Sequence, residues 1–227
     1  MIIETTVRLR SILILAICGL FVAGSHGEEE SEVSFSFRTL FLDSPSREFT
    51  FLSEGEIRPF PIGFDLLSKR ASYRGDGSLM IFSQEPNLEK DLEDQAVATV
   101  SFVRTDSMVT LICFDTGDKL ECLKVDSDFG VFPKGTFCFI NATADQVVGL
   151  LGEERISISP GSLFKAKAED FDTRRVPIKM AYLDDAGEWR VFYSSKWTML
   201  GEKRSFIIIY WDEQSRRLRA RGVNFSD

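Results

Sequence analysis

The feature that most constrains this chain is a succession of short apolar or alternating runs, each bounded by Gly, Asp, Pro or Ser turns. The runs are VSFSFRTLFL, EFTFL, SLMIFS, AVATVSFV, MVTLICF, LECLKV, TFCFI, RISIS, SLFKAKA, VPIKMAYL, WRVFYSS, SFIIIYW and RLRARGV. β-Branched and aromatic residues, among them 20 Phe, suit a pleated and half-buried surface. Many short strands with regular turns predict an all-β protein, built as sandwiches or as a barrel.

Two segments depart from this alternation. PNLEKDLEDQ, at residues 86–95, has helical spacing and helix-forming residues, enough for one or two turns; a charged, solvated connection is the alternative. SFIIIYW, at residues 205–211, is apolar without alternation, which predicts a strand that is buried on both faces.

Residues 39–63 and 138–161 have similar patterns, about 98 positions apart when one gap is allowed. Each runs from an apolar strand to Asp43 or Asn141, then through polar residues to a second strand, a Gly-Glu pair and an Ile-led strand. The Asp or Asn can form an Asx turn, and Gly55 or Gly152 can supply the positive φ of a hairpin. The similarity predicts two related β modules; chance similarity between two hairpins is the alternative.

The segments LDSPSREFTFLSEGE, INATADQVVGLLGE and PKGTFCF resemble a family of uncharacterised bacterial secreted domains that often occur in tandem. This family usually has a histidine before the first turn, where Leu42 stands here. The resemblance implies immunoglobulin-like β-sandwiches exported from a bacterium, and it implies no activity. We therefore expect two packed immunoglobulin-like modules, at residues 28–130 and 131–227; a single larger jelly roll or barrel is the alternative.

The N-terminus has the pattern of a secretory signal peptide over residues 1–27: Arg8 and Arg10, the apolar run ILILAICGLFVAG, and small residues in AGSHG. Cleavage after Ser25 or after Gly27 fits equally, and lipidation at Cys18 is an alternative. We expect an exported protein, periplasmic or extracellular, without membrane insertion after cleavage.

Charge and histidine content exclude several functions. The chain has 27 basic and 35 acidic residues, which fall to 25 and 34 after signal removal, a net charge of −9. Such an acidic chain without a basic tract is a poor ligand for nucleic acids or anionic membranes. The one histidine, His26, lies at the cleavage site, so no Ser-His-Asp triad, Cys-His pair or histidine-based metal site is expected in the mature protein, and we predict no cofactor.

Three cysteines remain after signal removal: Cys113, Cys122 and Cys138. A Gly117-Asp118 loop would place Cys113 directly opposite Cys122, whereas a Thr116-Gly117 loop would place it opposite Leu120 and segregate the apolar residues better. We favour the second register, with buried free thiols or an optional bridge, and keep a Cys113–Cys122 disulfide as the alternative.

Several short motifs match known sites, but chance matches explain the glycosylation triplets, and turns explain the Arg-Gly-Asp sequence and the acidic clusters. Asn141-Ala-Thr143 and Asn224-Phe-Ser226 match the glycosylation triplet, and Arg74-Gly75-Asp76 matches an adhesion tripeptide. The acidic clusters at 115–118, 126–130, 169–172 and 184–185 lack the spacing of an EF-hand calcium loop.

The last 40 or so residues hold all three tryptophans. Alternation places Trp189, Tyr193 and Ser195 on one strand face, so Trp189, Tyr193 and Trp197 are candidates for an aromatic binding platform; core packing is the alternative. We expect an exported non-enzymatic protein that binds a protein or glycan partner of unknown identity. A carboxylate-dependent carbohydrate-active enzyme using Glu188, and an assembly factor using an open strand edge, are the alternatives.

Overall fold

The computed structural model describes residues 32–184, 186–213 and 215–225. The predicted signal peptide, Cys18 and His26 lie outside these residues. Apart from two single-turn 3₁₀ helices, η1 (Glu93–Gln95) and η2 (Ala168–Asp170), the regular elements of the described residues are all β-strands.

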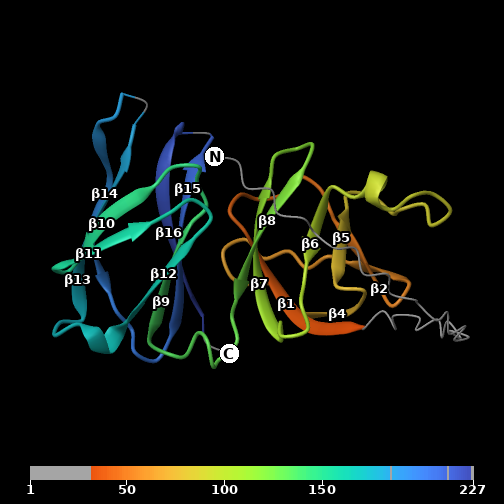
Figure 1. Cartoon of the computed structure of the whole chain (residues 1–227), viewed down its shortest axis with the longest axis horizontal. Helices are drawn as coiled ribbons and strands as arrows, with labels where there is room; N and C mark the ends of the chain where they lie inside the picture. Colours follow the sequence, from red (N-terminus) through yellow and green to blue (C-terminus); the bar gives the residue numbers. More distant parts are fainter. Residues whose placement is uncertain (1–31, 185, 214, 226–227) are drawn as a thin grey trace, which may run out of the picture. The chain divides into compact units, whose positions relative to one another are not determined.

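The first eight strands form two sheets, coloured from orange to green in Figure 1. They are β1 (Val33–Phe41), β2 (Thr50–Ser53), β3 (Glu56–Pro59), β4 (Ala71–Gly75), β5 (Ser78–Phe82), β6 (Ala98–Ser101), β7 (Met108–Asp115) and β8 (Leu120–Asp126). One sheet has the order β4-β1-β7-β8 and the other β3-β2-β5-β6. Only the β1–β7 pair in these sheets is parallel.

The next eight strands repeat this arrangement. They are β9 (Thr136–Asn141), β10 (Val147–Leu151), β11 (Glu154–Ile158), β12 (Leu163–Lys167), β13 (Arg175–Leu183), β14 (Trp189–Thr198), β15 (Arg204–Asp212) and β16 (Arg217–Phe225). The sheet orders β12-β9-β15-β16 and β11-β10-β13-β14 equal those of the first half with every strand number raised by eight. The β9–β15 pair is again parallel. The predicted pair of sandwich modules is confirmed, and the single barrel is wrong because four open sheets are present.

Each module encloses its own apolar core between its two sheets. In the first, alternate residues of β1 such as Phe35 and Phe37 meet Leu79 and Ile81 of β5. In the second, Phe137 of β9 lies in one cluster with residues of β10, β11 and β13. The period-two alternation of side chains therefore explains why these runs fold as strands of sandwiches.

A third apolar cluster joins the two modules. Its members lie on strands β1, β7, β8, β9, β15 and β16 or in the connections that follow β1 and β8: Leu40, Leu42, Ile112, Val125, Phe132, Cys138, Ile140, Phe206, Ile208, Tyr210, Val223 and Phe225. Strand β15 consequently has its alternate side chains in two different cores, and residues 204–210 are all buried. This confirms the strand predicted to be buried on both faces, although Trp211 at its end is 42% exposed.

Two arginines donate hydrogen bonds to backbone carbonyl groups around this junction. Arg204 is buried and donates to the carbonyl oxygens of Ser127 (2.8 Å) and Phe132 (3.3 Å), in the connection between β8 and β9. Arg221 of β16 donates to the carbonyl oxygen of Leu42 (2.7 Å), beyond the end of β1. Charged donors to otherwise unsatisfied carbonyls are among the stronger hydrogen bonds, so both side chains help to fix the modules to each other.

The two similar segments occupy equivalent places at a constant separation of 98 residues. Leu40 and Cys138 face the module junction, whereas the next residues, Phe41 and Phe139, face the cores. The two-residue turns are Glu54-Gly55 and Gly152-Glu153, because the flanking pairs are Ser53 with Glu56 and Leu151 with Glu154. The gap expected from the Gly-Glu alignment is therefore wrong: both glycines have positive φ, but they hold different turn positions.

The connection at 83–97 is a loop with one 3₁₀ turn, not a helix of two turns. The Gln95 side chain organises it: it accepts a hydrogen bond from the Asn87 N–H (2.7 Å) and donates to the carbonyl oxygens of Asn87 (3.0 Å) and Asp91 (2.8 Å). These side-chain bonds replace the backbone ladder that a helix would need.

The β7–β8 hairpin has the register that was not favoured from the sequence, the one with a Gly117-Asp118 loop. Cys113 lies opposite Cys122, not opposite Leu120 as favoured from the sequence. Two hydrogen bonds hold the turn: the Gly117 N–H donates to the Asp115 carboxylate (3.0 Å), and the Thr116 N–H donates to the Lys119 carbonyl oxygen (3.0 Å). The hydrogen bonds of the turn thus determine the register, although the other register would separate apolar from polar side chains slightly better.

Replacing Phe206 with Ala tests the module junction. Phe206 is fully buried and stacks on Phe132, with ring centroids 5.0 Å apart. Loss of a buried ring should lower the free energy of unfolding by about 3–5 kcal/mol. Urea denaturation measures this, with Leu163→Ala, at a 44% exposed position, as the control. A similar small loss for both variants would contradict the buried junction.

Candidate functional site

The best-formed candidate surface is the side of the β11-β10-β13-β14 sheet that faces away from the core. We call it the outer face, and it consists of the following residues, which pair with one another across the four strands: Val148, Leu150, Arg155, Ser157, Arg175, Pro177, Lys179, Ala181, Leu183, Trp189, Val191, Ser194, Lys196 and Thr198. All of them are exposed or half-buried.

Cross-strand pairing arranges these residues in rows. Val148 lies between Ser157 and Ala181, and Ala181 pairs in turn with Val191. The next row runs from Arg155 through Leu150 to Lys179 and Ser194. Leu183 pairs with Trp189 at one end of the face, and Pro177 with Lys196 towards the other. One end of the face is therefore apolar and the other basic.

The charge of the outer face is opposite to that of the whole protein. It carries Arg155, Arg175, Lys179 and Lys196 and no acidic side chain, whereas the chain has a net charge of −8. None of these four cations forms an ion pair with another residue in the described part of the chain. Four unpaired cations on one face create a local positive field that favours anionic groups.

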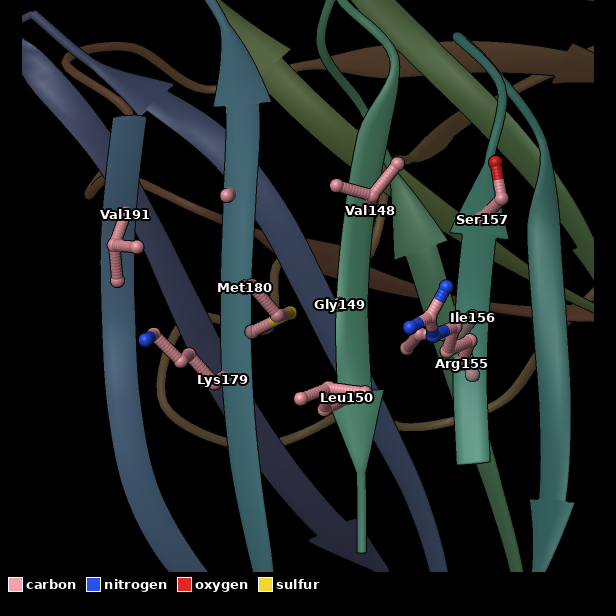
Figure 2. A pocket seen from close by; sticks show the side chains of 10 residues that line it. Val148, Gly149, Leu150, Arg155, Ile156, Ser157, Lys179, Met180 and Val191 are labelled. Carbon is pink, nitrogen blue, oxygen red and sulfur yellow. The ribbon is translucent and has the colours of Figure 1, made fainter. Parts of the chain in front are cut away.

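A hollow of about 560 Å³ crosses all four strands at the middle of the outer face. Figure 2 shows Val191, Lys179, Leu150 and Arg155 projecting around it from the four strands. At its centre is Gly149, where a Cβ would lie 2.6 Å from the Lys179 carbonyl oxygen. The absence of a side chain there keeps the sheet tightly paired and leaves Met180 and Ile156 to fill the core side.

The equivalent sheet of the first module is partly covered. Its β5–β6 connection, residues 83–97, places Leu92 in one hollow with Leu52 and Met80 from the outward side of β2 and β5. The corresponding β13–β14 connection of the second module is only residues 184–188. The short hairpin leaves Leu183, Trp189 and Val191 between 42% and 54% exposed.

The three aromatic residues predicted as a platform do not share one face. Tyr193 and Trp197 meet edge to face, with ring centroids 5.5 Å apart, and Trp197 stacks on Phe139 of the core at 6.0 Å. Trp189 lies on the outer face and is 52% exposed. The expected common face is wrong because a β-bulge between Met180 and Ala181 shifts the alternation. A binding role for these aromatics stays a prediction, with Trp189 at the exposed face.

The carboxylates beside Trp189 are engaged in the hairpin. Asp184 accepts hydrogen bonds from the Ala186 and Glu188 N–H groups (3.0 and 2.8 Å) and from Arg190 Nε (2.7 Å). The Arg190 guanidinium, with these N–H groups, lowers the pKa of Asp184 below its usual value. Glu188 also pairs with Arg190, at 2.9 Å. A lowered pKa favours an ionised structural carboxylate, whereas a general acid needs a raised one.

The described cysteines are free thiols, and two of them face each other. Cys113 Sγ and Cys122 Sγ are 3.5 Å apart, one in the core of the first module and one at its margin. Burial and the neighbouring Cys122 raise the pKa of Cys113, and burial raises the pKa of Cys138 to about 12. Both buried thiols stay protonated at neutral pH, which makes them poor nucleophiles.

Two of the other short motifs occupy turns, whereas Asn224 and Phe225 of the third lie in strand β16. Asn141 is buried; its Oδ1 accepts from the Thr143 N–H, and its Nδ2 donates to the carbonyl oxygens of Asp145 and Ile158. Asp76 accepts from the Tyr73 hydroxyl and the Ser78 N–H, which fixes the turn of the Arg-Gly-Asp sequence. These contacts bear out the interpretation of both motifs as turn formers.

The described residues lack two features, a cluster of metal ligands and a membrane-spanning helix. No three His, Cys, Asp or Glu side chains of this part of the chain gather as a metal site would require. Nor does it contain a helix of the length and apolarity needed to cross a membrane.

No protein-family model matches this chain, and no curated protein matches it by sequence. Sequence reasoning missed the outer face, although RVPIKMAYL carries a signal for it. Alternate positions hold Arg175, Pro177, Lys179, Ala181 and Leu183, whereas Val176, Ile178 and Met180 lie in the core.

Replacing Gly149 with Ala tests how tightly the floor of the hollow is packed. The new Cβ would lie 2.6 Å from a backbone oxygen, so strands β10 and β13 must separate locally. We expect the free energy of unfolding to fall by about 1–3 kcal/mol in urea denaturation. Gly222→Ala, whose Cβ meets nothing within 4 Å, is the matched control and should change stability by much less.

Mild oxidation tests the cysteine pair. One molecule of oxidised glutathione should accept two electrons from the Cys113 and Cys122 thiols, giving one cross-strand disulfide and two glutathione thiols. Non-reducing peptide mapping should then recover Cys113 linked to Cys122, with Cys138 free. Recovery of unlinked Cys113 after complete reaction with the oxidant, or a bridge to Cys138, would contradict this.

Proposed function

We propose that this protein is an exported, non-enzymatic binding protein whose outer face on β11-β10-β13-β14 binds an acidic protein partner. The single observation that carries the proposal is the combination on this face of an exposed apolar hollow with four cations that form no ion pair with a described residue. The signal-peptide pattern of residues 1–27 supports export.

The mixture of groups favours a protein partner over a glycan. Leu150, Leu183 and Val191 are exposed aliphatic side chains, which gain by burial against other aliphatic or aromatic side chains. Trp189 adds an exposed aromatic ring of the type enriched at the centres of protein interfaces. A sugar would use the tryptophan but would leave the aliphatic rows without an apolar partner.

The basic residues supply orientation and a faster encounter. Lys179 and Arg155 border the hollow, while Lys196 and Arg175 extend the positive end of the face. Charges at the rim of an interface mainly steer association and select against partners of the wrong sign. A partner with an apolar group followed by carboxylates would match both ends of the outer face.

The engaged carboxylates support a non-enzymatic function. Among the described residues, Asp184 and Glu188 are the acidic ones of the hairpin that carries Trp189, and both form ion pairs with Arg190 at 2.9 Å or less. Their contacts stabilise the hairpin that presents Trp189.

The test is titration of the whole protein with a synthetic peptide of about 12 residues that alternates Glu and Leu. Amide NMR signals of Val148, Leu150, Lys179 and Val191 should shift, and binding should weaken as salt screens the charges. Lys179→Glu/Lys196→Glu should raise the Kd at least about tenfold. Lys119→Glu/Lys203→Glu, at exposed positions outside this face, should leave the Kd unchanged.

Two further probes decide between the alternatives. A peptide that alternates Lys and Leu should not bind, since it lacks the complementary charge. Binding of a sulfated oligosaccharide without binding of the acidic peptide would replace the protein partner with a glycan. Equal binding of the acidic peptide by the native protein and the Lys179→Glu/Lys196→Glu variant would overturn the assignment of the outer face.

A further inference from the structure

The first module displays a surface of the opposite charge. Residues 85–95, which we call the acidic connection, carry five exposed acidic side chains and one basic residue, Lys90. The acidic residues are Glu85, Glu89, Asp91, Glu93 and Asp94. None of the five forms an ion pair with a described residue.

The acidic connection also presents an unused apolar side chain. Leu88 is 56% exposed, at the centre of this acidic sequence. Leu92, by contrast, lines a hollow of its own module with Leu52 and Met80. One leucine therefore anchors the connection to its own sheet while the other remains free for a second surface.

The acidic connection is ordered before it meets a partner. Three hydrogen bonds of the Gln95 side chain join its two ends, and the Asp91 carboxylate accepts the Glu93 N–H at 2.9 Å. Pro86 is buried against the rest of the module. An element that is already shaped loses less conformational entropy on binding.

From this complementarity we propose that the acidic connection of one copy of this chain docks on the outer face of a second copy. Leu88 enters the hollow beside Leu150 and Val191, and the carboxylates face Arg155, Lys179 and Lys196. This inference rests on the proposed binding function and names its partner. The two surfaces are complementary. The acidic connection presents an exposed leucine surrounded by carboxylates, and the outer face presents an apolar hollow bordered by cations.

The pairing is head to tail, because the two surfaces belong to different modules of the chain. Such a heterologous contact leaves one surface of each kind free at the ends of a dimer, so longer chains of copies or a closed ring can form. The contact is small, since one short connection covers one hollow, and small interfaces of this kind are weak and reversible. Association should therefore depend on concentration and fall as ionic strength rises.

Sedimentation velocity of the whole chain over a concentration series tests the proposal. At low ionic strength the sedimentation coefficient should rise with concentration, and at about 0.5 M salt it should return towards the monomer value. Lys179→Glu/Lys196→Glu reverses the outer face, and Glu89→Lys/Glu93→Lys reverses the acidic connection. Each variant alone should associate at least about tenfold more weakly, because like charges then meet.

Mixing the two charge-reversed variants is the decisive measurement. The native acidic connection of one fits the native outer face of the other, and the two reversed surfaces are also complementary, so the mixture should associate again. Lys119→Glu/Lys203→Glu is the matched control and should behave as the native chain does. Leu88→Ser should weaken association without altering charge, and urea denaturation confirms that each variant is folded.

Three outcomes would overturn the proposal: a native chain that stays monomeric throughout the series, association that survives either charge reversal, or a mixture that does not restore it. The peptide titration separates this failure from failure of the proposed function. A monomeric chain that still binds the Glu-Leu peptide at the outer face keeps the binding function and rejects the second copy as partner. A chain that does neither rejects both.

Discussion

The rest of the structure depends on the apolar junction between the β4-β1-β7-β8 and β12-β9-β15-β16 sheets. Because their central strands are buried on both sides, Leu40 and Phe41 of β1, or Ile207 and Ile208 of β15, contribute to different cores from adjacent positions. The buried Arg204 satisfies carbonyl groups of the connection between the modules, and rings of Phe129 and Phe225 lie over its guanidinium at 4.2 and 4.8 Å. Removing this apolar surface from water stabilises the packing of the two modules against each other.

The junction also determines where a binding surface can lie. Each module uses one sheet for the junction, so the sheet on its other side is the one whose outward residues meet solvent. In the first module the 83–97 connection brings Leu92 over this sheet, and in the second the connection ends after five residues. The same strand order thus yields one partly covered face and one bare face, and the difference is in a loop, not in the sheets.

Much of the fold could be predicted from the sequence because its signals are local. Alternating runs predicted the strands, and the unbroken apolar run at residues 206–210 predicted a strand buried on both faces. Asn141 and Gly152 predicted turns. The Cys113 register was wrong because the Asp115 and Thr116 turn bonds outweigh apolar segregation. The common face of Trp189 and Tyr193 failed for a different reason: a bulge depends on the partner strand, which the sequence of one strand does not specify.

The candidate site was harder to predict because it exists only across strands. Lys179 and Arg155 are 24 positions apart and become near neighbours through Leu150, which pairs with both. Yet the alternation that builds the core leaves this surface free to vary: Val176, Ile178 and Met180 fill the core, and Arg175, Pro177 and Lys179 between them do not. Substitutions on the outer face therefore change its charge with little effect on the packing beneath it. A sandwich that fixes its stability through one sheet can devote the outward side of the other to recognition.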